Sequence, residues 1–326
     1  MKFISTNNDY EVHSFSEAIL TGLCPDGGLL MPEFLPKFTI TQLESWKNLS
    51  YPYLMAEFLK FIVDKNDPVY EHISDISKET FSKFDKNIVE IKKLKSCFVV
   101  ELFHGPTKAF KDYPLFPLAY LIDKAIKIKA KENKGIMKKQ NLLIATTGDT
   151  GSSSLESSRF YTDTLCVYMP YNLVRLLWIF SDHDTNFTKS TMSKIEQGEK
   201  VTIPLKIMEK IRSVIIDSYA ANDDETLKTI STCFNEEHYC ICPHTATALS
   251  YFYHKNEVGN INAILGTASI EKFSEAGIEA GLKDKFENSI FLTQLQSKKE
   301  VFTVLNENED PNETTTKCYF FINFFH

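Results

Sequence analysis

The chain has 326 residues, of which 43% are hydrophobic and 13% aromatic, so it can fill the core of one large domain or two ordinary ones. Its 36 Lys and Arg against 43 Asp and Glu leave a formal charge of -7, which argues against a nucleic-acid partner. The seven cysteines are scattered, which predicts reduced thiols. The sequence has no apolar segment after Met1 and no apolar window long enough to span a membrane. We therefore expect a cytoplasmic protein without a membrane partner, with secretion as an open alternative.

The first part of the chain, residues 1–87, has the pattern of a small N-terminal domain built from short helices. Ser14 stands three residues before Glu17, and Thr41 stands three residues before Glu44, each ahead of an apolar turn. This spacing is typical of a helix start closed by a capping box. We therefore expect helices that begin directly after Ser14 and Thr41.

The middle of the chain, residues 88–285, predicts an α/β domain. Continuous apolar runs at residues 99–103 (VVELF) and 141–148 (NLLIATTG) are typical of strands covered on both faces. A long helical segment at residues 112–131 lies between them. A strand, a helix and a strand at this spacing form a βαβ unit, the building block of a doubly wound parallel sheet.

After this unit the pattern is mainly helical. The segment TLCVYMP at residues 164–170 is a further candidate strand, and from residue 172 on the apolar spacings are mostly three and four. They predict a helix-dominated region through NLVRLLWIF, KSTMSKIEQG, PLKIMEKIRSVI, DETLKTISTCF, YCICP, HTATALSYFYH, NAILGTAS and IEKFSEAGIEAGL. Residues 286–326 pass from polar to aromatic residues and predict a disordered tail.

The strongest local signal is HGPTKAFKD at residues 104–112, between a predicted strand and the next helix. Open α/β sheets place ligands at that position. A lysine there that is partly desolvated and close to backbone N–H groups has a lowered pKa, and its amine can condense with an aldehyde. Both Lys108 and Lys111 fit this hypothesis, and an ordinary surface lysine at a helix start is the alternative. The residues by themselves do not choose between the two lysines.

A second signal, TTGDTGSSS at residues 146–154, follows the next predicted strand and opens a helix. Its glycines and small hydroxyl residues let backbone N–H groups approach an anion at the positive end of the helix dipole. We expect the loop to bind a carboxylate or a phosphate, with a tight turn that binds nothing as the alternative.

The segment HYCICPH places His238, Cys240, Cys242 and His244 at alternate positions, so an extended strand would point all four side chains one way. Zinc ligands usually come from two separate elements, so we predict buried structural thiols and no metal. The chain also lacks G-x-S-x-G and H-E-x-x-H motifs, which argues against serine hydrolase and zinc protease chemistry.

Several long motifs, in order, resemble those of the threonine synthase family: STNN, SFSEAILTGLCPDGGLLMPEFLP, ELFHGPTKAFKD and IATTGDTGSSSLES. The later segments MPYNLVRLLWIFSD, CPHTATALSYFYH and GTASIEKFSEAG most resemble the animal threonine synthase-like phospho-lyases. The resemblance covers about residues 1–285. It implies an α/β protein of pyridoxal-phosphate (PLP) fold type II, tryptophan synthase β-like, with a parallel sheet and a small N-terminal domain.

The resemblance also implies a site. In the family the lysine of the F-K-D motif holds PLP, which points to Lys111 rather than Lys108 as the catalytic residue. Thr267 lies in the segment that resembles the one facing the pyridine nitrogen of the cofactor. The substrate carboxylate would be held by the loop formed by Thr147, Gly148, Asp149, Thr150 and Gly151, in which Thr147 stands where serine is usual.

The chemistry implied by the resemblance is the release of phosphate from a small O-phosphorylated amino acid. PLP withdraws electrons from the α-carbon, and Lys111 moves the proton. A phospho-lyase converts O-phosphothreonine or O-phosphohomoserine into 2-oxobutyrate, ammonia and phosphate. The alternative is a threonine synthase, which adds water and makes threonine from O-phosphohomoserine. The oligomeric state does not follow from the sequence.

One departure from the family concerns the PLP phosphate. In the family a long stretch with several strands and a glycine-rich phosphate loop follows the TTGDTG-type loop, whereas here only residues 159–168 stand in its place. Between Gly151 and Gly259 the only glycine is Gly198. The chain thus looks internally truncated, as in a splice variant, a deleted paralogue or a faulty gene model. A catalytically inactive form with a binding or signalling role is a further alternative function.

Overall fold

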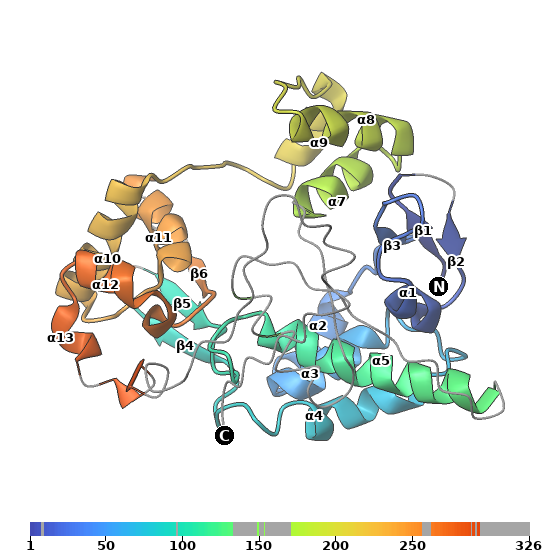
Figure 1. The fold of residues 1–326 in the computed structure, drawn as a ribbon, viewed down its shortest axis with the longest axis horizontal. Helices are drawn as coiled ribbons and strands as arrows, with labels where there is room; N and C mark the ends of the chain where they lie inside the picture. Colours follow the sequence, from blue (N-terminus) through green and yellow to red (C-terminus); the bar gives the residue numbers. More distant parts are fainter. Residues whose placement is uncertain are drawn as a thin grey trace, which may run out of the picture. The chain divides into compact units, whose positions relative to one another are not determined.

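The computed structural model describes residues 1–7, 10–95, 97–132, 149, 153, 171–255, 262–287, 289–290 and 292–293 (Figure 1). The chain forms two compact units: Met1–Ala220 with Val258–Ala268, and Ala221–Glu257 with Ser269–His326. No helix among the described residues combines the length and the apolar character that crossing a bilayer requires.

The first unit begins with a small antiparallel sheet. Its strands have the order β2-β1-β3, with β1 at Phe3–Ser5, β2 at Glu11–Val12 and β3 at Leu30–Pro32. The sequence pattern indicates only helices in this region. Strands as short as these do not show the apolar alternation by which a strand is predicted, so the sheet was missed.

The N-terminal helices are short, and the first begins where the sequence predicts. They are α1 (Phe15–Thr21), α2 (Ile40–Trp46), α3 (Tyr51–Leu59), the 3-10 helix η1 (Tyr70–Asp75) and α4 (Ile76–Glu79). Ser14 precedes α1, and its Oγ accepts a hydrogen bond from the Glu17 N–H at 3.1 Å. The predicted cap at Ser14 is therefore confirmed.

The second predicted cap is wrong by two residues. Thr39, not Thr41, precedes α2: the Thr39 Oγ1 accepts the Gln42 N–H at 3.2 Å, and the Gln42 side chain accepts the Thr39 N–H at 2.8 Å. Glutamine serves as well as glutamate at the third helical position of a capping box. Because the box closes at Thr39, Thr41 lies inside the first helical turn.

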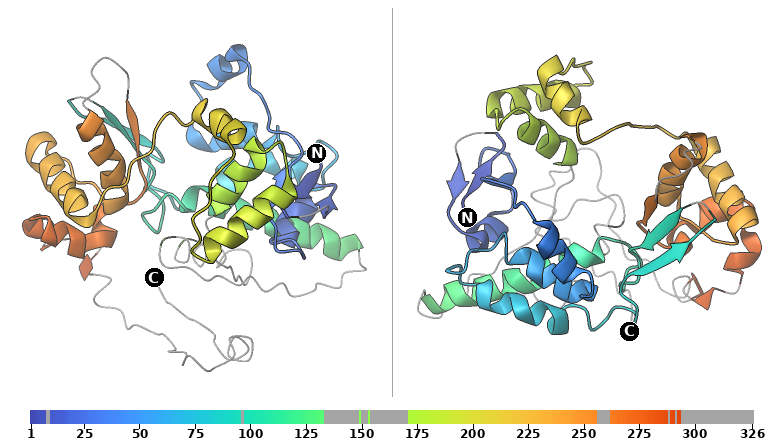
Figure 2. Two further views of the ribbon diagram at one scale, coloured as in Figure 1. Left: turned by 90° about the horizontal axis from the view of Figure 1, so that it is seen from above. Right: turned by 180° about the vertical axis from the view of Figure 1, so that it is seen from behind.

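The long helix α5 (Asp112–Glu132) confirms the helix predicted at residues 112–131. It packs against α1 and α4 in the first unit (Figure 2). Its buried face and the N-terminal helices share one hydrophobic core, made of Ala56, Val63, Val69, Ile73, Ile76, Phe81, Phe84, Tyr113, Phe116, Tyr120, Leu121 and Ala125. This shared core fixes the start of α5, and with it the loop that precedes the helix.

A second sheet has the strand order β4-β5-β6, with β4 at Glu90–Lys93, β5 at Phe98–Glu101 and β6 at Ala263–Gly266. The strand predicted at residues 99–103 is confirmed as β5. Its partner β4 is antiparallel, while β6 is parallel to it and sets Gly266 opposite Glu101. The strands predicted at residues 141–148 and 164–170 lie outside the described residues.

Among the described residues, the first unit also contains α7 (Tyr171–Phe180), α8 (Thr185–Glu196) and α9 (Leu205–Arg212), which confirm three predicted helices. A small core joins α7 and α8 to the N-terminal region. It contains Leu29, Val174, Leu177 and Met192.

In the second unit, the elements formed by the described residues are all helices. Its elements are α10 (Asp223–Glu237), α11 (Pro243–Lys255), the 3-10 helix η2 (Ile270–Phe273), α12 (Ser274–Glu279) and α13 (Lys283–Phe286). Helices α10 and α11 pack against each other, and both were predicted from their apolar spacing. Most of the predicted tail, from residue 294 on, lies outside the described residues.

Candidate functional site

The first candidate site lies where β5 and β6 end. The two strands are parallel, so their carboxyl ends meet at one edge of the sheet. The chain that leaves β5 runs into α5, and on the way the Phe110 N–H donates a hydrogen bond to the Thr267 carbonyl oxygen at 2.8 Å. A β-bridge between Ala109 and Ala268 continues this contact. The structure therefore brings Lys111 and Thr267, which are far apart in sequence, onto adjoining backbone segments.

The two candidate lysines have different places in this loop. Lys111 is half-buried at the residue before α5, and its Nζ lies 4.7 Å from the centroid of the Phe110 ring. Lys108 has a φ of 55°, in the left-handed region that residues other than glycine rarely adopt. Its backbone N–H donates to the Gly105 carbonyl oxygen at 3.0 Å and closes a turn. Lys108 thus shapes the turn, while Lys111 stands at the helix start.

Asp112 holds the loop in shape. This residue is fully buried, and its carboxylate accepts hydrogen bonds from the Thr107 backbone N–H at 2.8 Å and from the Thr107 hydroxyl at 2.7 Å. Gly105 packs directly against it, because a Cβ added at Gly105 would lie 2.6 Å from the Asp112 Cβ. A buried carboxylate requires such hydrogen-bond donors. The residue that follows Lys111 therefore ties down the loop that precedes it.

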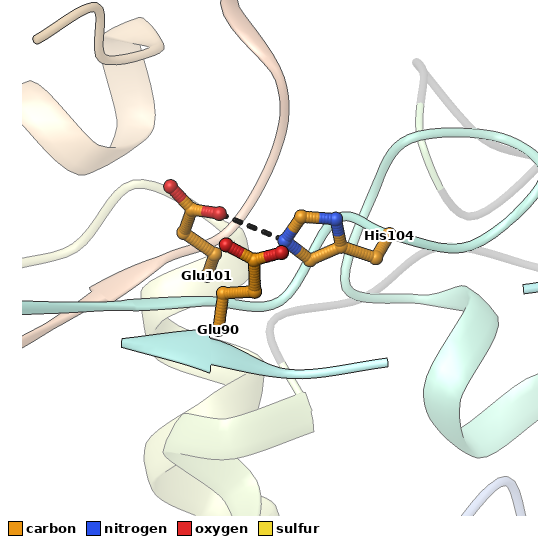
Figure 3. Close-up of side chains that lie close together, drawn as sticks. All are labelled: Glu90, Glu101 and His104. Atoms are coloured by element: carbon orange, nitrogen blue, oxygen red, sulfur yellow. Dashed lines mark hydrogen bonds and ion pairs between the residues drawn. The ribbon is translucent and has the colours of Figure 1, made fainter. Parts of the chain in front are cut away.

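A polar cluster lies at the start of the same loop (Figure 3). Glu90 in β4 stands opposite Glu101 in β5, and His104 Nε2 lies 2.8 Å from Glu101 Oε2. The nearest ligand atoms of the three side chains all lie within 4.8 Å of one another. The sequence predictions missed this cluster, because Glu90 reaches it only through strand register. The one local signal was the spacing of Glu101 and His104 in ELFH.

The predicted carboxylate-binding loop lies largely outside the described residues. Thr147, Gly148, Thr150 and Gly151 belong to the part of the chain that is not described, and Asp149 is described only as a half-buried helical residue. The role of this loop stays a prediction.

The HYCICPH segment does not form the strand that would align its four side chains. His238 ends α10 with a left-handed backbone, whereas Cys242 stands before α11 and its Sγ accepts the Thr245 N–H at 3.4 Å. Burial raises the pKa of the Cys240 thiol. Within the described ranges, the groups of three or more potential metal ligands do not include these residues.

Known proteins resemble this chain in sequence. The family described as threonine synthase N terminus matches residues 2–82. Threonine synthase-like 2 of Xenopus laevis is 22% identical over 464 residues, covering 95% of this chain and 96% of that protein. Threonine synthase of Pseudomonas aeruginosa is 35% identical over 161 residues, covering 49% of this chain and 33% of that protein.

A solved structure, that of PLP-bound threonine synthase from Brucella melitensis, superimposes with a TM-score of 0.79 at 20% identity and covers 94% of this chain and 96% of its own. The Xenopus alignment runs over 464 residues while this chain has 326, so this chain is the shorter of the two. The predicted place of the shortening, residues 159–168, lies outside the described residues. The matches confirm the resemblance inferred from the motifs: the chain has the threonine synthase fold, which is PLP fold type II, and is similar to threonine synthases and threonine synthase-like 2 proteins.

Proposed function

We propose that this chain uses PLP to release phosphate from an O-phosphorylated amino acid, as a phospho-lyase. One observation carries the proposal: the hydrogen bond from Phe110 to Thr267 sets Lys111 at the carboxyl edge of a parallel strand pair. Open α/β sheets bind ligands at that edge. The Brucella melitensis threonine synthase, which shares the fold, has PLP bound.

The described residues fit the reactive end of PLP better than its phosphate end. Lys111 offers a half-buried primary amine to the aldehyde, and Thr267 offers a hydroxyl group for the ring nitrogen. A glycine-rich cradle for the phosphate is not found among the described residues: between residues 151 and 259 the sequence has one glycine, Gly198, which is exposed after α8. The Asp112 carboxylate also occupies the start of α5, where the helix dipole would otherwise attract an anion. We therefore expect Lys111 to be the main anchor.

In the proposed reaction, PLP supplies an electron sink that makes the α-proton of the amino acid acidic. The residues of the chain supply proton transfer and positioning. The Lys111 amine accepts the α-proton while the bond from the neighbouring carbon of O-phosphothreonine to the phosphate oxygen breaks and phosphate departs. Water then hydrolyses the released unsaturated amine to 2-oxobutyrate and ammonia. Thr107 and Asp112 keep the loop in one shape, so that the amine stays close to the proton. Residues 147–151 would bind the substrate carboxylate through their backbone N–H groups.

The choice between lyase and synthase depends on the product. The lyase is preferred because the segments MPYNLVRLLWIFSD, CPHTATALSYFYH and GTASIEKFSEAG most resemble the animal threonine synthase-like phospho-lyases. Purified protein with PLP should convert O-phosphothreonine into 2-oxobutyrate, ammonia and phosphate, measured by mass spectrometry. Formation of threonine from O-phosphohomoserine would instead establish a threonine synthase.

The role of Lys111 is tested by trapping. After incubation with PLP and reduction with borohydride, peptide mapping of the wild type should find the coenzyme on Lys111, and Lys111→Ala should remain unmodified. Lys108→Asn is the matched control, because asparagine tolerates the left-handed backbone at that position and should leave the modification intact. Coenzyme trapped on Lys108, or undiminished trapping in Lys111→Ala, would refute the assignment.

A catalytically inactive protein with a binding or signalling role is the second candidate function. The single glycine between residues 151 and 259 favours it, because a weak phosphate site reduces the hold on PLP. This alternative predicts a folded wild type that gains no visible absorbance with PLP and yields no modified lysine.

A further inference from the structure

The Glu90, Glu101 and His104 cluster is not used by the proposed reaction (Figure 3). Strand register sets Glu90 directly opposite Glu101. Like charges that face each other across an antiparallel pair destabilise it. The two carboxylates therefore need the polar groups around them to offset their mutual repulsion.

Glu90 is compensated at the sheet surface. Lys92 Nζ lies 2.7 Å from its Oε2, and Asn87 Nδ2 donates to its Oε1 at 2.9 Å. These contacts, with that of Lys92 the larger, lower the pKa of Glu90. Glu101 is in a different situation, because its side chain is only 5% exposed. The His104 ring, itself 15% exposed, reaches this buried carboxylate at 2.8 Å.

His104 also connects two other segments to the end of β5. Its Nδ1 lies 3.5 Å from Asp85 Oδ2, and its carbonyl oxygen accepts the Asp85 N–H at 2.9 Å. Its own backbone N–H donates to the Tyr113 hydroxyl oxygen at 3.3 Å, in the first turn of α5. The ring stacks on Phe103 with centroids 5.2 Å apart. All of these contacts are made at the residue directly before Gly105. The loop that leads to Lys111 turns at Gly105.

We infer that His104 is a positioning residue for Lys111: its ring, held between Glu101 and Asp85, sets the path by which the loop leaves β5. The inference rests on the proposed PLP function. A buried polar contact of this kind adds little net stability, since lost hydration offsets the attraction. The position of a reacting amine matters far more, because a misplacement of about 1 Å can cost roughly a hundredfold in rate.

The test distinguishes an effect on the position of the loop from an effect on the stability of the whole protein. His104→Phe keeps the stacked ring but removes the contact with the buried Glu101, so the double variant Glu101→Gln/His104→Phe removes the charge of that carboxylate as well. His104→Gln retains a hydrogen-bond donor toward Glu101 and serves as the conservative rescue. His13→Phe is the control, because His13 is a surface histidine whose side chain is 74% exposed.

Two quantities are measured for each variant, and variants are compared only where their urea midpoints of unfolding are the same. The PLP concentration that half-saturates borohydride trapping at Lys111 should rise roughly tenfold or more in the double variant, return most of the way in His104→Gln, and stay at the wild-type value in His13→Phe. Without PLP, hydrogen exchange of the peptide that contains the Phe110 amide should become faster in the double variant, because that amide is bonded to Thr267.

Unchanged trapping together with unchanged exchange in the double variant would overturn the inference. Zn²⁺ binding to the wild type that Glu90→Gln abolishes would also overturn it, because the cluster would then be a metal centre. Failure of the proposed function gives another result: the wild type itself would show no trapped Lys111, while the exchange measurement would still report whether His104 holds the loop.

Discussion

Gly105 shows how little room the Lys111 loop leaves for change. It is buried against Asp112, and the carboxylate of Asp112 is in turn fixed by two hydrogen bonds from Thr107. A methyl group at Gly105 would therefore have to displace a residue that cannot move without breaking those bonds. The loop and the start of α5 form one packed unit.

Gly105→Ala should consequently lose both stability and coenzyme capture. Overpacking of this kind costs about 1–3 kcal/mol, so the urea midpoint should fall, and borohydride trapping at Lys111 should fall with it. Gly198→Ala is the contrast: Gly198 has a φ of 77° and no atom within 4 Å of an added Cβ, so only backbone strain is expected there. If Gly105→Ala trapped PLP as well as the wild type does, this would show that Asp112 moves freely.

Single residues of the site were predictable to different degrees. The strand end and the helix start placed residues 104–112 correctly, but local pattern left Lys108 and Lys111 equivalent. Only the family resemblance separated them. The bond between Phe110 and Thr267 joins segments far apart in sequence, and the burial of Glu101 depends on register. Periodicity and capping carry no information on such contacts.

Among the elements, α3 and α5 meet through aromatic rings. Tyr51 at the start of α3 lies with its ring centroid 5.1 Å from that of Tyr113 and 5.7 Å from that of Phe81. Burial raises the pKa of Tyr51 from 10.0 to about 12, and burial also raises the pKa of Tyr113. The hydroxyl groups in this core therefore stay neutral at pH values where unfolded tyrosine ionises.

This raised pKa predicts a loss of stability in alkali. The folded chain holds the Tyr51 proton while the unfolded chain releases it, so stability is full below pH 10.0 and falls as the pH rises toward about 12. The urea midpoint of the wild type should drop between pH 10.0 and about pH 12, and Tyr51→Phe should show a smaller drop. Tyr53→Phe, at an exposed position on the same helix, should behave as the wild type.

Element prediction succeeded where the pattern is long or a cap is present. The apolar spacing of α5 and the continuous run of β5 indicated both correctly, and Ser14 marked the start of α1. The strands β1 to β3 are too short to carry a period. Strand β6 lies within NAILGTAS, which was wrongly predicted as part of the helical region. Its pairing with β5 joins residues far apart in sequence, a contact that no local window contains.

At the scale of the whole molecule, we propose that the chain binds the phosphate group of PLP only weakly. A cradle of backbone N–H groups adds charge-assisted hydrogen bonds of about 1.5–3 kcal/mol each. With one glycine, Gly198, between residues 151 and 259, we expect such bonds to be few. The phosphate group should then add little to coenzyme affinity.

The expected result is that pyridoxal and PLP bind with affinities within roughly a factor of ten, since no set of charge-assisted bonds favours the phosphate. The measurement is half-saturation of borohydride trapping at Lys111 with each compound. Lys111→Ala provides the background. A preference for PLP of a hundredfold or more would show that the chain builds a phosphate site from other residues.

The parallel pairing of β5 with β6 also has a consequence for the order of events during synthesis. Phe98 pairs with Ala263, so the pairing waits until residue 263 has left the ribosome. Contacts between such distant segments form slowly, because a long loop must close first. The helical core around α5 can assemble early, whereas the strand edge beside Lys111 is completed only after β6 has been synthesised. A nascent chain arrested before residue 263 would therefore contain Lys111 but lack the strand β6 that completes its surroundings.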